Sequence, residues 1–357
     1  MAFAMLAAHA ASALVVGTPR SAPPQMSAAS VSVFIDGEAG TTGLQVLGRL
    51  EKRGDIKLIT LPEDKRKDTA ARAEAINAAD AVILCLPDAA AIEAVALCTP
   101  DNDRTVFIDA STAHRTNADW VYGFAEMDGG QRDAIAASRR IANPGCYPTG
   151  FIAATRPLVS AGLLNKDARL VASAVSGYSG GGKPLMEIFE GEEPHEPWGA
   201  YGFNLDHKHL PEMCQYSGLD EPPIFLPAVG SFAQGMVVSV PIRYADLTSA
   251  ATGGSASAGE VLHAALVKHY EGQKFVKVMP FAGAQGGIDS SLLERGAFLR
   301  PDLLNDTNQL ELFVYCNDER KTCVVAARLD NLGKGASGAA VQNLNIALGL
   351  DEAAGLK

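Results

Sequence analysis

One of the six cysteines stands in a setting that suits a reactive nucleophile. The segment around it reads NPGCYPTG, from Asn143 to Gly150. Pro144 keeps the residue before it extended, and Pro148 suits the first turn of a helix, so Cys146 is expected at a helix N-terminus. The partial positive charge of a helix N-terminus stabilises a thiolate over a thiol. We therefore predict that Cys146 is a nucleophile with a lowered pKa.

A thiol nucleophile needs a base, and the densest group of histidines supplies the candidates. The run HKHLPEM contains His207, His209 and Glu212. Pro211 predicts a helix that starts just after His209, which places Glu212 within about one turn, close enough to orient an imidazole or to bind substrate. Two histidines and a carboxylate could also form a metal triad, but this spacing is not diagnostic and no further acidic cluster completes it. We expect no bound metal.

Three glycines follow the first predicted strand and suit the binding of a dinucleotide. Gly37, Gly40 and Gly43 enclose Thr41 and Thr42. A Rossmann fold uses glycines here for a tight turn, for close approach to a pyrophosphate, and for packing of helix on strand. The free N–H groups of the following helix would face the phosphates. The spacing departs from G-x-G-x-x-G, so a plain turn is the alternative interpretation.

A charged run at the end of the second predicted strand bears on the choice of cofactor. It reads EDKRKD and includes Lys65 and Arg66. The carboxylates Glu63 and Asp64 suit the ribose 2′-hydroxyl of NAD, whereas the cations suit the 2′-phosphate of NADP. A solvated charged turn is the alternative.

Two further segments could bind smaller anions. The run GYSGGGK matches the phosphate-loop pattern G-x-x-x-x-G-K, but Pro184 stands where the Mg²⁺-binding hydroxyl should be, so a P-loop is rejected. Its Ser179 and Lys183 could still bind a phosphate group. Ser111 and Arg115 follow the fourth predicted strand, where ligands of parallel sheets gather.

The elements that must position these residues form two patterns. In the first part of the chain, strands alternate with helices, which predicts a Rossmann-type doubly wound parallel sheet. The expected strands are 31–35, 56–61, 81–86 and 105–109, and the expected helices are 44–50, 69–78 and 89–97.

After about residue 150, strand-like segments follow one another with hardly a helix between the later ones. They predict an α+β catalytic and dimerisation domain with a mixed or antiparallel sheet. A final helix, 337–350, is apolar enough to pack back on the first domain. The expected strands are 170–175, 225–229, 236–244, 274–279, 310–315 and 322–329. The predicted divisions are 1–30, a leader; 31–145, the dinucleotide-binding domain; 146–330, the catalytic domain; and 331–357, the returning helix.

Composition excludes several classes of protein. The 357 residues carry 30 Lys and Arg against 41 Asp and Glu, and no long basic block could follow a phosphate backbone, so nucleic acid is excluded as a partner. The cysteines include no C-x-x-C pair, which argues against a disulfide framework or zinc knuckle and for a reducing compartment. An apolar fraction of 47% with 35 Gly and 19 Pro is typical of a globular α/β protein.

Residues 1–30 differ from the rest because they contain no Asp or Glu and only one basic residue, Arg20. The apolar piece from Ala2 to Val16 is too short for a membrane anchor, so no membrane partner is expected. The segment is either an organelle-targeting leader or a disordered extension. The expected location is accordingly the cytoplasm, or an organelle stroma or matrix.

Taken together, these segments resemble the N-acetyl-gamma-glutamyl-phosphate reductase family, in particular its shorter, second type. The resemblance runs from Val33 to Asn345, while 248–259 looks like an insertion in a surface loop. The segments that carry it are VFIDGEAGTTGLQ, LPEDKRKD, ANPGCYPTG, AVSGYSGGGK, HKHLPEM, ELFVY and RLDNLGKGASGAAVQNLN.

The resemblance implies reduction of N-acetylglutamyl 5-phosphate to the 5-semialdehyde with NADPH, the third step of arginine synthesis. The nucleophile of the family falls on Cys146 and its base on His209, with a thioester as the covalent intermediate. The resemblance also implies that Arg115, Ser179 and Lys183 recognise phosphate or carboxylate groups. A small-molecule acyl phosphate is then the substrate, and a homodimer or homotetramer is expected.

Two other classes stay open. Aspartate-semialdehyde dehydrogenase shares this fold and chemistry, but the segments HKHLPEM and SGYSGGGK disfavour it. A non-catalytic dinucleotide-binding subunit would have no use for a cysteine at a helix N-terminus.

Overall fold

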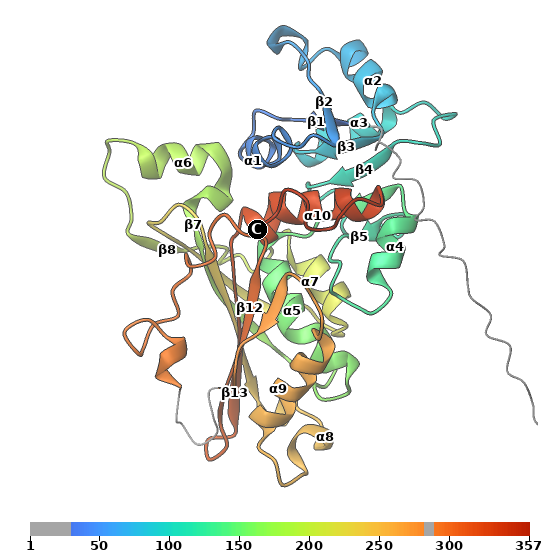
Figure 1. Cartoon of the computed structure of the whole chain (residues 1–357). Helices are drawn as coiled ribbons and strands as arrows, with labels where there is room; N and C mark the ends of the chain where they lie inside the picture. Colours follow the sequence, from blue (N-terminus) through green and yellow to red (C-terminus); the bar gives the residue numbers. More distant parts are fainter. Residues whose placement is uncertain (1–29, 282–288) are drawn as a thin grey trace, which may run out of the picture.

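The computed structural model describes residues 30–281 and 289–357 (Figure 1). All but the last residue of the predicted leader lie outside the described residues. Within the described ranges, no helix is both long and apolar enough to cross a bilayer.

The first part of the chain folds into a six-stranded sheet in the order β2-β1-β3-β4-β6-β5. Every pairing in it is parallel, and helices follow its strands, which confirms the predicted doubly wound sheet. The inner strands β3 and β4 are buried along their whole length, as expected for a parallel sheet that is covered on both faces. The strands are β1 Val31–Asp36, β2 Ile56–Ile59, β3 Ala81–Leu84, β4 Val106–Asp109, β5 Val121–Tyr122 and β6 Arg140–Ala142; the helices are α1 Thr41–Leu50, α2 Thr69–Ala78, α3 Asp88–Ala96 and α4 Gln131–Ala137.

The second sheet has seven strands in the order β11-β12-β13-β10-β7-β9-β8. It is mixed, because β7 pairs with β9 and β11 with β12 in parallel while the other neighbours are antiparallel. This confirms the predicted second fold class. The strands are β7 Val171–Gly177, β8 Trp198–Ala200, β9 Ile224–Gly230, β10 Met236–Arg243, β11 Val276–Val278, β12 Leu310–Asn317 and β13 Thr322–Leu329.

The prediction of hardly a helix between the later strands was wrong. Between β10 and β11 lie α8, Ser249–Thr252, and the three-turn α9, Ala258–His269, so 248–259 is not simply a loop insertion. Ser257 caps α9 by accepting a hydrogen bond from the Glu260 N–H, and the Glu260 carboxylate accepts one from the Ser257 N–H. This capping box was readable in the sequence as S-x-x-E.

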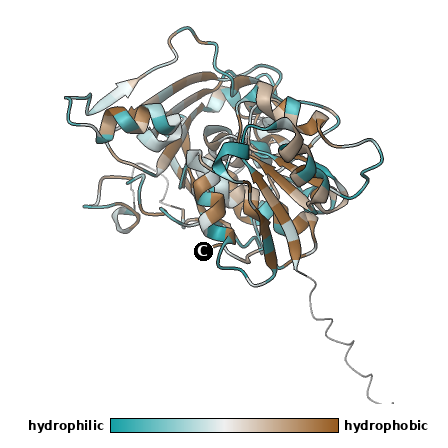
Figure 2. Ribbon diagram, turned by 90° about the horizontal axis from the view of Figure 1, so that it is seen from above, coloured by the Kyte–Doolittle hydropathy of each residue, from teal (hydrophilic) through white to brown (hydrophobic). Residues whose placement is uncertain are grey.

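Helix α5, Cys146–Ser160, forms the centre of the second part of the molecule (Figure 1). Phe151, Ile152 and Leu158 are fully buried, and the helix packs against β10, β13, α7 (Leu210–Ser217) and α9. Seen from above, the strands are largely hydrophobic, whereas the helices and loops carry hydrophilic and hydrophobic residues in alternation (Figure 2). The start of α5 is therefore held by the main core.

The chain returns to the first sheet at its C-terminal end. A π-helical turn, Gly333–Ser337, leads from β13 into α10, Gly338–Ala347. Val341 and Leu344 of α10 are buried in the same apolar cluster as Ile35. Figure 1 shows α10 between the first sheet and α5. The exact divisions between domains stay a prediction.

Candidate active site

The residue before Cys146 is the point at which the polar groups of the site meet. Helix α5 begins at Cys146, as predicted, with Gly145 as its N-cap. A Cβ on Gly145 would lie 2.6 Å from Arg115 Nη1, 2.8 Å from Glu212 Oε1 and 2.8 Å from His209 Nε2. Only glycine leaves room for these three side chains.

The predicted lowering of the Cys146 pKa was wrong for this structure. Removal of the thiol from water raises the pKa of Cys146 to about 11, although the Arg115 guanidinium and the Tyr147 N–H both act to lower it. Desolvation of a thiolate thus outweighs the helix N-terminus. At neutral pH the group is a thiol, and a base must take its proton before it can attack.

His209 is placed to act as this base. It is the N-cap of α7, which begins at Leu210 as predicted from Pro211. Burial holds the pKa of His209 well below its usual range, and the neighbouring cations Arg115 and Lys208 lower it further. The imidazole is therefore neutral at neutral pH and can accept a proton. Its Nδ1 is buried and has no hydrogen-bond partner among the described residues.

Glu212 is bound to groups other than the imidazole. Its carboxylate accepts hydrogen bonds from Arg115 Nη1 at 2.6 Å, from Tyr122 Oη at 2.8 Å and from the Gly145 N–H at 3.1 Å. The nearest approach to His209 Nε2 is 4.0 Å, beyond hydrogen-bond range. Glu212 therefore holds the Arg115 guanidinium and the cysteine loop, by which we mean residues 143–146. It does not orient the His209 imidazole directly, which was one of the two predicted roles.

Arg115 joins the loop after β4 to the cysteine loop. Its Nε donates to the Asn143 carbonyl at 3.0 Å and its Nη2 to the Ala110 carbonyl at 3.1 Å. The side chain is buried beside Glu212, and the ion pair raises the pKa of Arg115 despite the opposing effect of burial. A fixed positive charge thus lies next to Cys146.

A cavity of about 660 Å³ opens over Cys146. His207 and His209 line it, and the His207 Nδ1 accepts a hydrogen bond from the His209 N–H at 3.2 Å. Burial lowers the pKa of His207. Further residues that line the cavity are Tyr147, Leu185, Phe189, Tyr201, Lys208 and Val229.

The glycine turn has the close contacts that were predicted for it. Gly37 has a φ of 89°, and a Cβ on it would collide with the Cys85 carbonyl oxygen. A Cβ on Gly43 would collide with the Gly37 carbonyl oxygen. Helix α1 can therefore start close to β1, with Gly40 as its N-cap and Thr41 as its first residue.

A second cavity, of about 360 Å³, lies at the start of α1. Gly40, Thr41 and Thr42 line it together with Ala110 and Lys183. Lys183 comes from α6, Gly182–Glu190, and Thr41 Oγ1 lies 3.8 Å from Met186 Sδ of the same helix. Lys183, predicted to bind substrate, is thus placed with the glycine turn and not in the cavity over Cys146.

The predicted cations lie at the edge of the glycine turn. Lys65 and Arg66 are exposed in the connection that follows β2, and Arg66 Nη2 pairs with Glu38 Oε1 of the glycine turn at 2.7 Å. Arg72 was not predicted from the sequence. Its Nη2 lies 2.8 Å from Oδ2 of Asp36, at the end of β1. The position of Asp36 at a strand end was the available signal.

Two predicted substrate-binding serines have their hydroxyls engaged within the protein. Ser111 Oγ donates to Asp109 Oδ2 at 2.7 Å and accepts from the Ala113 N–H at 3.2 Å. Ser179 Oγ accepts from Asn331 Nδ2 at 3.0 Å. Neither lines the cavity over Cys146. Over the described ranges, no three His, Cys, Asp or Glu side chains converge as metal ligands would.

Comparisons with known proteins show what the chain as a whole is similar to. A family model described as the dimerisation domain of semialdehyde dehydrogenase matches residues 146–331. N-acetyl-gamma-glutamyl-phosphate reductase 2 of Nostoc sp. is 50% identical over 91% of this chain and 98% of its own. N-acetyl-gamma-glutamyl-phosphate reductase of Mesorhizobium japonicum is 50% identical over 89% of this chain and 99% of its own.

Solved structures share the fold at much lower identity. Aspartate semialdehyde dehydrogenase II of Vibrio cholerae, complexed with ASA, matches with a TM-score of 0.63 and 15% identity over 89% of this chain and 98% of its own. Aspartate semialdehyde dehydrogenase of Candida albicans, solved with NADP, matches with a TM-score of 0.59 and 12% identity over 89% of this chain and 99% of its own.

Proposed function

The chain belongs to the N-acetyl-gamma-glutamyl-phosphate reductase family, and we propose a mechanism in which Cys146 is acylated by the substrate and then reduced. The protein is an oxidoreductase that converts N-acetyl-L-glutamyl 5-phosphate to N-acetyl-L-glutamate 5-semialdehyde and phosphate. This is the third step of arginine synthesis. The observation that carries the proposed mechanism is a half-buried thiol at the start of α5 that shares one cavity with a neutral imidazole.

The first half of the reaction follows from the two protonation states. His209 takes the proton of the Cys146 thiol, and the thiolate attacks the acyl carbon of the substrate. The bond from this carbon to the phosphate oxygen breaks, and inorganic phosphate leaves with the bonding electrons. The charge of Arg115, held by Glu212, stabilises the thiolate and the oxygen that becomes negative during the attack.

In the second half the thioester is reduced. The nicotinamide cofactor, when bound, supplies the hydride. Hydride addition leaves a tetrahedral oxyanion bound to the Cys146 sulfur. The oxygen electrons re-form the carbonyl as the carbon–sulfur bond breaks, and His209, now protonated, gives its proton to the departing sulfur, so that the aldehyde and the Cys146 thiol are released. One residue thus acts first as a base and then as an acid.

The glycine turn fits the phosphates of a dinucleotide. Gly37 and Gly43 bring α1 close to β1, so the free N–H groups of Thr41 and Thr42 face the cavity that Gly40 also lines. We assign Lys183 to the same cofactor phosphates because it lines this cavity. The exposed cations Lys65 and Arg66, of which Arg66 pairs with Glu38 of the turn, favour NADPH over NADH.

Substrate recognition divides the predicted residues into two groups. His207 lines the cavity over Cys146 and Arg115 lies at its cysteine end, so both stay candidates for binding the acyl phosphate. Ser111 and Ser179 would each have to release an internal hydrogen bond, or use a remaining lone pair or proton, in order to bind substrate. We therefore regard Ser111 and Ser179 as weaker candidates for substrate binding than His207 and Arg115.

Assembly is expected to involve the second sheet. The matching family model is a dimerisation domain, which supports a homo-oligomer, and we propose a dimer or tetramer. Light scattering on the eluting protein would give its molar mass, and a single-chain mass would contradict the proposal.

A steady-state assay tests the function. The protein should oxidise NADPH when given N-acetylglutamyl 5-phosphate, and in reverse it should reduce NADP⁺ when given the semialdehyde with phosphate. An aspartate-semialdehyde dehydrogenase would prefer aspartyl 4-phosphate, and a non-catalytic subunit would turn over neither. Either of those results would contradict the proposed substrate.

A further inference from the structure

A short turn packs closely against Cys146. The π-helical turn Gly333–Ser337 packs against the start of α5, and a Cβ on Gly335 would lie 2.7 Å from the Cys146 Cβ. The Gly335 N–H donates to the Asp330 carbonyl at 2.9 Å, which fixes the path of the turn. Any shift of this turn toward α5 would therefore move the cysteine.

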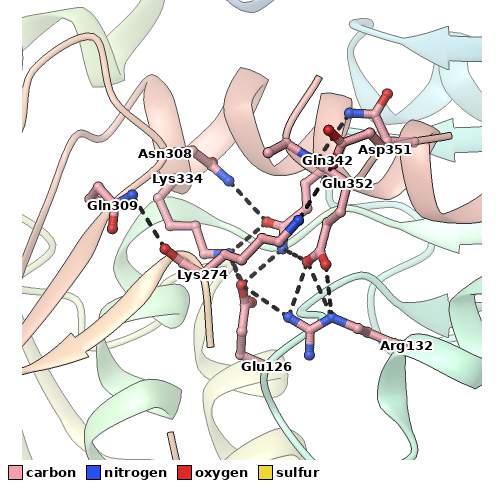
Figure 3. Close-up of polar contacts among 11 residues, drawn as sticks. Glu126, Arg132, Lys274, Asn308, Gln309, Lys334, Gln342, Asp351 and Glu352 are labelled. Atoms are coloured by element: carbon pink, nitrogen blue, oxygen red, sulfur yellow. Dashed lines mark hydrogen bonds and ion pairs between the residues drawn. The ribbon is translucent and has the colours of Figure 1, made fainter. Parts of the chain in front are cut away.

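A fully buried lysine anchors the turn next to Gly335. The Lys334 side chain is 2% exposed, and its ammonium donates to both carboxylate oxygens of Glu126 at 2.8 Å and to Gln342 Oε1 at 2.7 Å (Figure 3). These are all the hydrogen bonds that an ammonium group can donate. The carboxylate of Glu126 is itself completely buried.

The network extends from this pair to elements far apart in the chain. Gln342 of α10 donates to Glu126 Oε1 and to Glu352 Oε1, both at 2.8 Å. Arg132 of α4 binds Glu352 at 3.0 Å (Figure 3). The positive charges of Lys334 and Arg132 therefore balance the negative charges of Glu126 and Glu352. The network ties the turn to both α4 and α10.

A second set of contacts ties the same turn to the cysteine loop. Asn143 Nδ2 donates to the Ala336 carbonyl at 3.0 Å, and Asn343 Nδ2 donates to Asn143 Oδ1 at 3.0 Å. The turn is thus held on one side by Lys334 and on the other by the segment that leads into Cys146.

Stability alone does not account for such a cluster. A buried ion pair gains little over apolar side chains of the same volume because both charges must leave water. We propose that the network of Lys334, Glu126 and Gln342 is a positioning device that holds the turn Gly333–Ser337 against Cys146 and so fixes the thiol for attack. This inference rests on the proposed function, in which Cys146 is the nucleophile.

A double variant that removes both charges tests the proposal. Lys334→Met with Glu126→Gln leaves no unpaired charge in the interior and keeps the side-chain lengths. We expect kcat to fall about 10–10²-fold, since a small misplacement of a reacting group has effects of this size. The KM of the acyl phosphate and the Kd of NADPH should change little. The release of phosphate from acyl phosphate without NADPH should slow by the same factor as kcat.

A matched pair elsewhere provides the control. Arg328 is 6% exposed and pairs with Glu311 at 2.6 Å across β12 and β13. Arg328→Met with Glu311→Gln makes the same chemical change in the sheet, outside the network of Lys334, Glu126 and Gln342. The second partner of Arg328, Glu294 at 3.5 Å, is partly exposed and can stay solvated. This variant should leave kcat and phosphate release near the wild-type values. The milder Gln342→Met variant serves if the double variant of Lys334 and Glu126 does not fold, and it should lower kcat in the same selective way.

The outcomes separate this proposal from the proposed function. If Cys146→Ala retains turnover, the proposed function fails, whatever the variants of the network do. If Cys146→Ala is inactive but the network variants keep kcat and phosphate release within about twofold of the wild type, the positioning role is overturned. An equal loss in the Arg328 control would overturn it as well, because the effect would then be a general one of lost buried charge.

Discussion

The glycine turn at α1 is shaped mainly by backbone that is close in the chain, whereas the pocket at Cys146 takes its polar groups from the loop after β4 and from the start of α7, which are far apart in the chain. Gly43 packs against the backbone of Gly37 and Glu38 within the turn, and Gly37 packs against Cys85, just after β3. Arg115, His209 and Glu212 converge on Gly145 from the loop after β4 and from the start of α7. In the proposed function the turn would bind a dinucleotide through backbone N–H groups, while the pocket depends on the buried charges of Arg115 and Glu212.

The two regions also differ in how water affects their charges. Lys65 and Arg66 are exposed beside the turn, so solvent and salt weaken their fields. At the pocket, burial raises the pKa of Cys146 and lowers that of His209, and both groups are therefore neutral before the reaction. Substitutions in the pocket should accordingly have much larger effects than substitutions beside the turn.

Replacement of the base should have the largest effect among the supporting residues. His209→Asn is expected to lower turnover by about 10²–10⁴-fold, which is typical of the loss of a general acid or base. Because burial lowers the pKa of His209, the wild-type rate should fall only as the pH drops well below 6.5, and this acid limb should be missing in the variant. A pH profile of kcat/KM checks both points. An acid limb that survives in His209→Asn would assign the base to another residue, with His207→Asn as the matched comparison.

Removal of the Glu212 charge should come next. Glu212→Gln leaves the buried Arg115 guanidinium without its counter-ion, which typically costs about 3–5 kcal/mol of the free energy of unfolding. Urea denaturation at neutral pH measures this cost. Asp128→Asn breaks a partly exposed pair with Arg156 and should cost less than about 1 kcal/mol. Equal losses in the two variants would show that the pocket is no more dependent on its charges than the surface is.

The smallest effect is expected beside the glycine turn. Lys65→Ala with Arg66→Ala should weaken NADPH binding by about 2–30-fold and NADH binding hardly at all, since each exposed contact contributes about 0.2–1 kcal/mol. The wild-type preference for NADPH should also shrink as salt rises. Fluorescence titration with both cofactors measures the change. Lys52→Ala with Lys57→Ala removes the same charge elsewhere. An equal effect in that control would show that the charged run with Lys65 and Arg66 is a solvated turn without a specific contact to NADPH.

The sequence was most informative where local rules decide the structure. Pro148 and Pro211 each indicated a helix start, and α5 and α7 begin where they were expected. The alternation of apolar strands with helices predicted the parallel sheet. The short strands β5 and β6 carried too few residues to give a pattern, and α9 was missed although its capping box stood in the sequence.

The environment of the site could not be read from local patterns. The helix N-terminus argument predicted a lowered pKa for Cys146 because the burial of a side chain by distant segments is not visible in the sequence. For the same reason Lys334 gave no sign that its charge would be buried against Glu126. Its segment was recognised only through the family resemblance, which the comparisons confirm.

The most direct test of the account is to look for the acyl group on Cys146. The protein is mixed with N-acetylglutamyl 5-phosphate in the absence of NADPH, and both the released phosphate and the mass of the cysteine peptides are measured. We expect about one phosphate per active chain in a rapid phase and an acyl adduct on the peptide that contains Cys146, with neither in Cys146→Ala. An acyl adduct on another cysteine would contradict the account. Full turnover by Cys146→Ala, with no adduct formed, would contradict it as well.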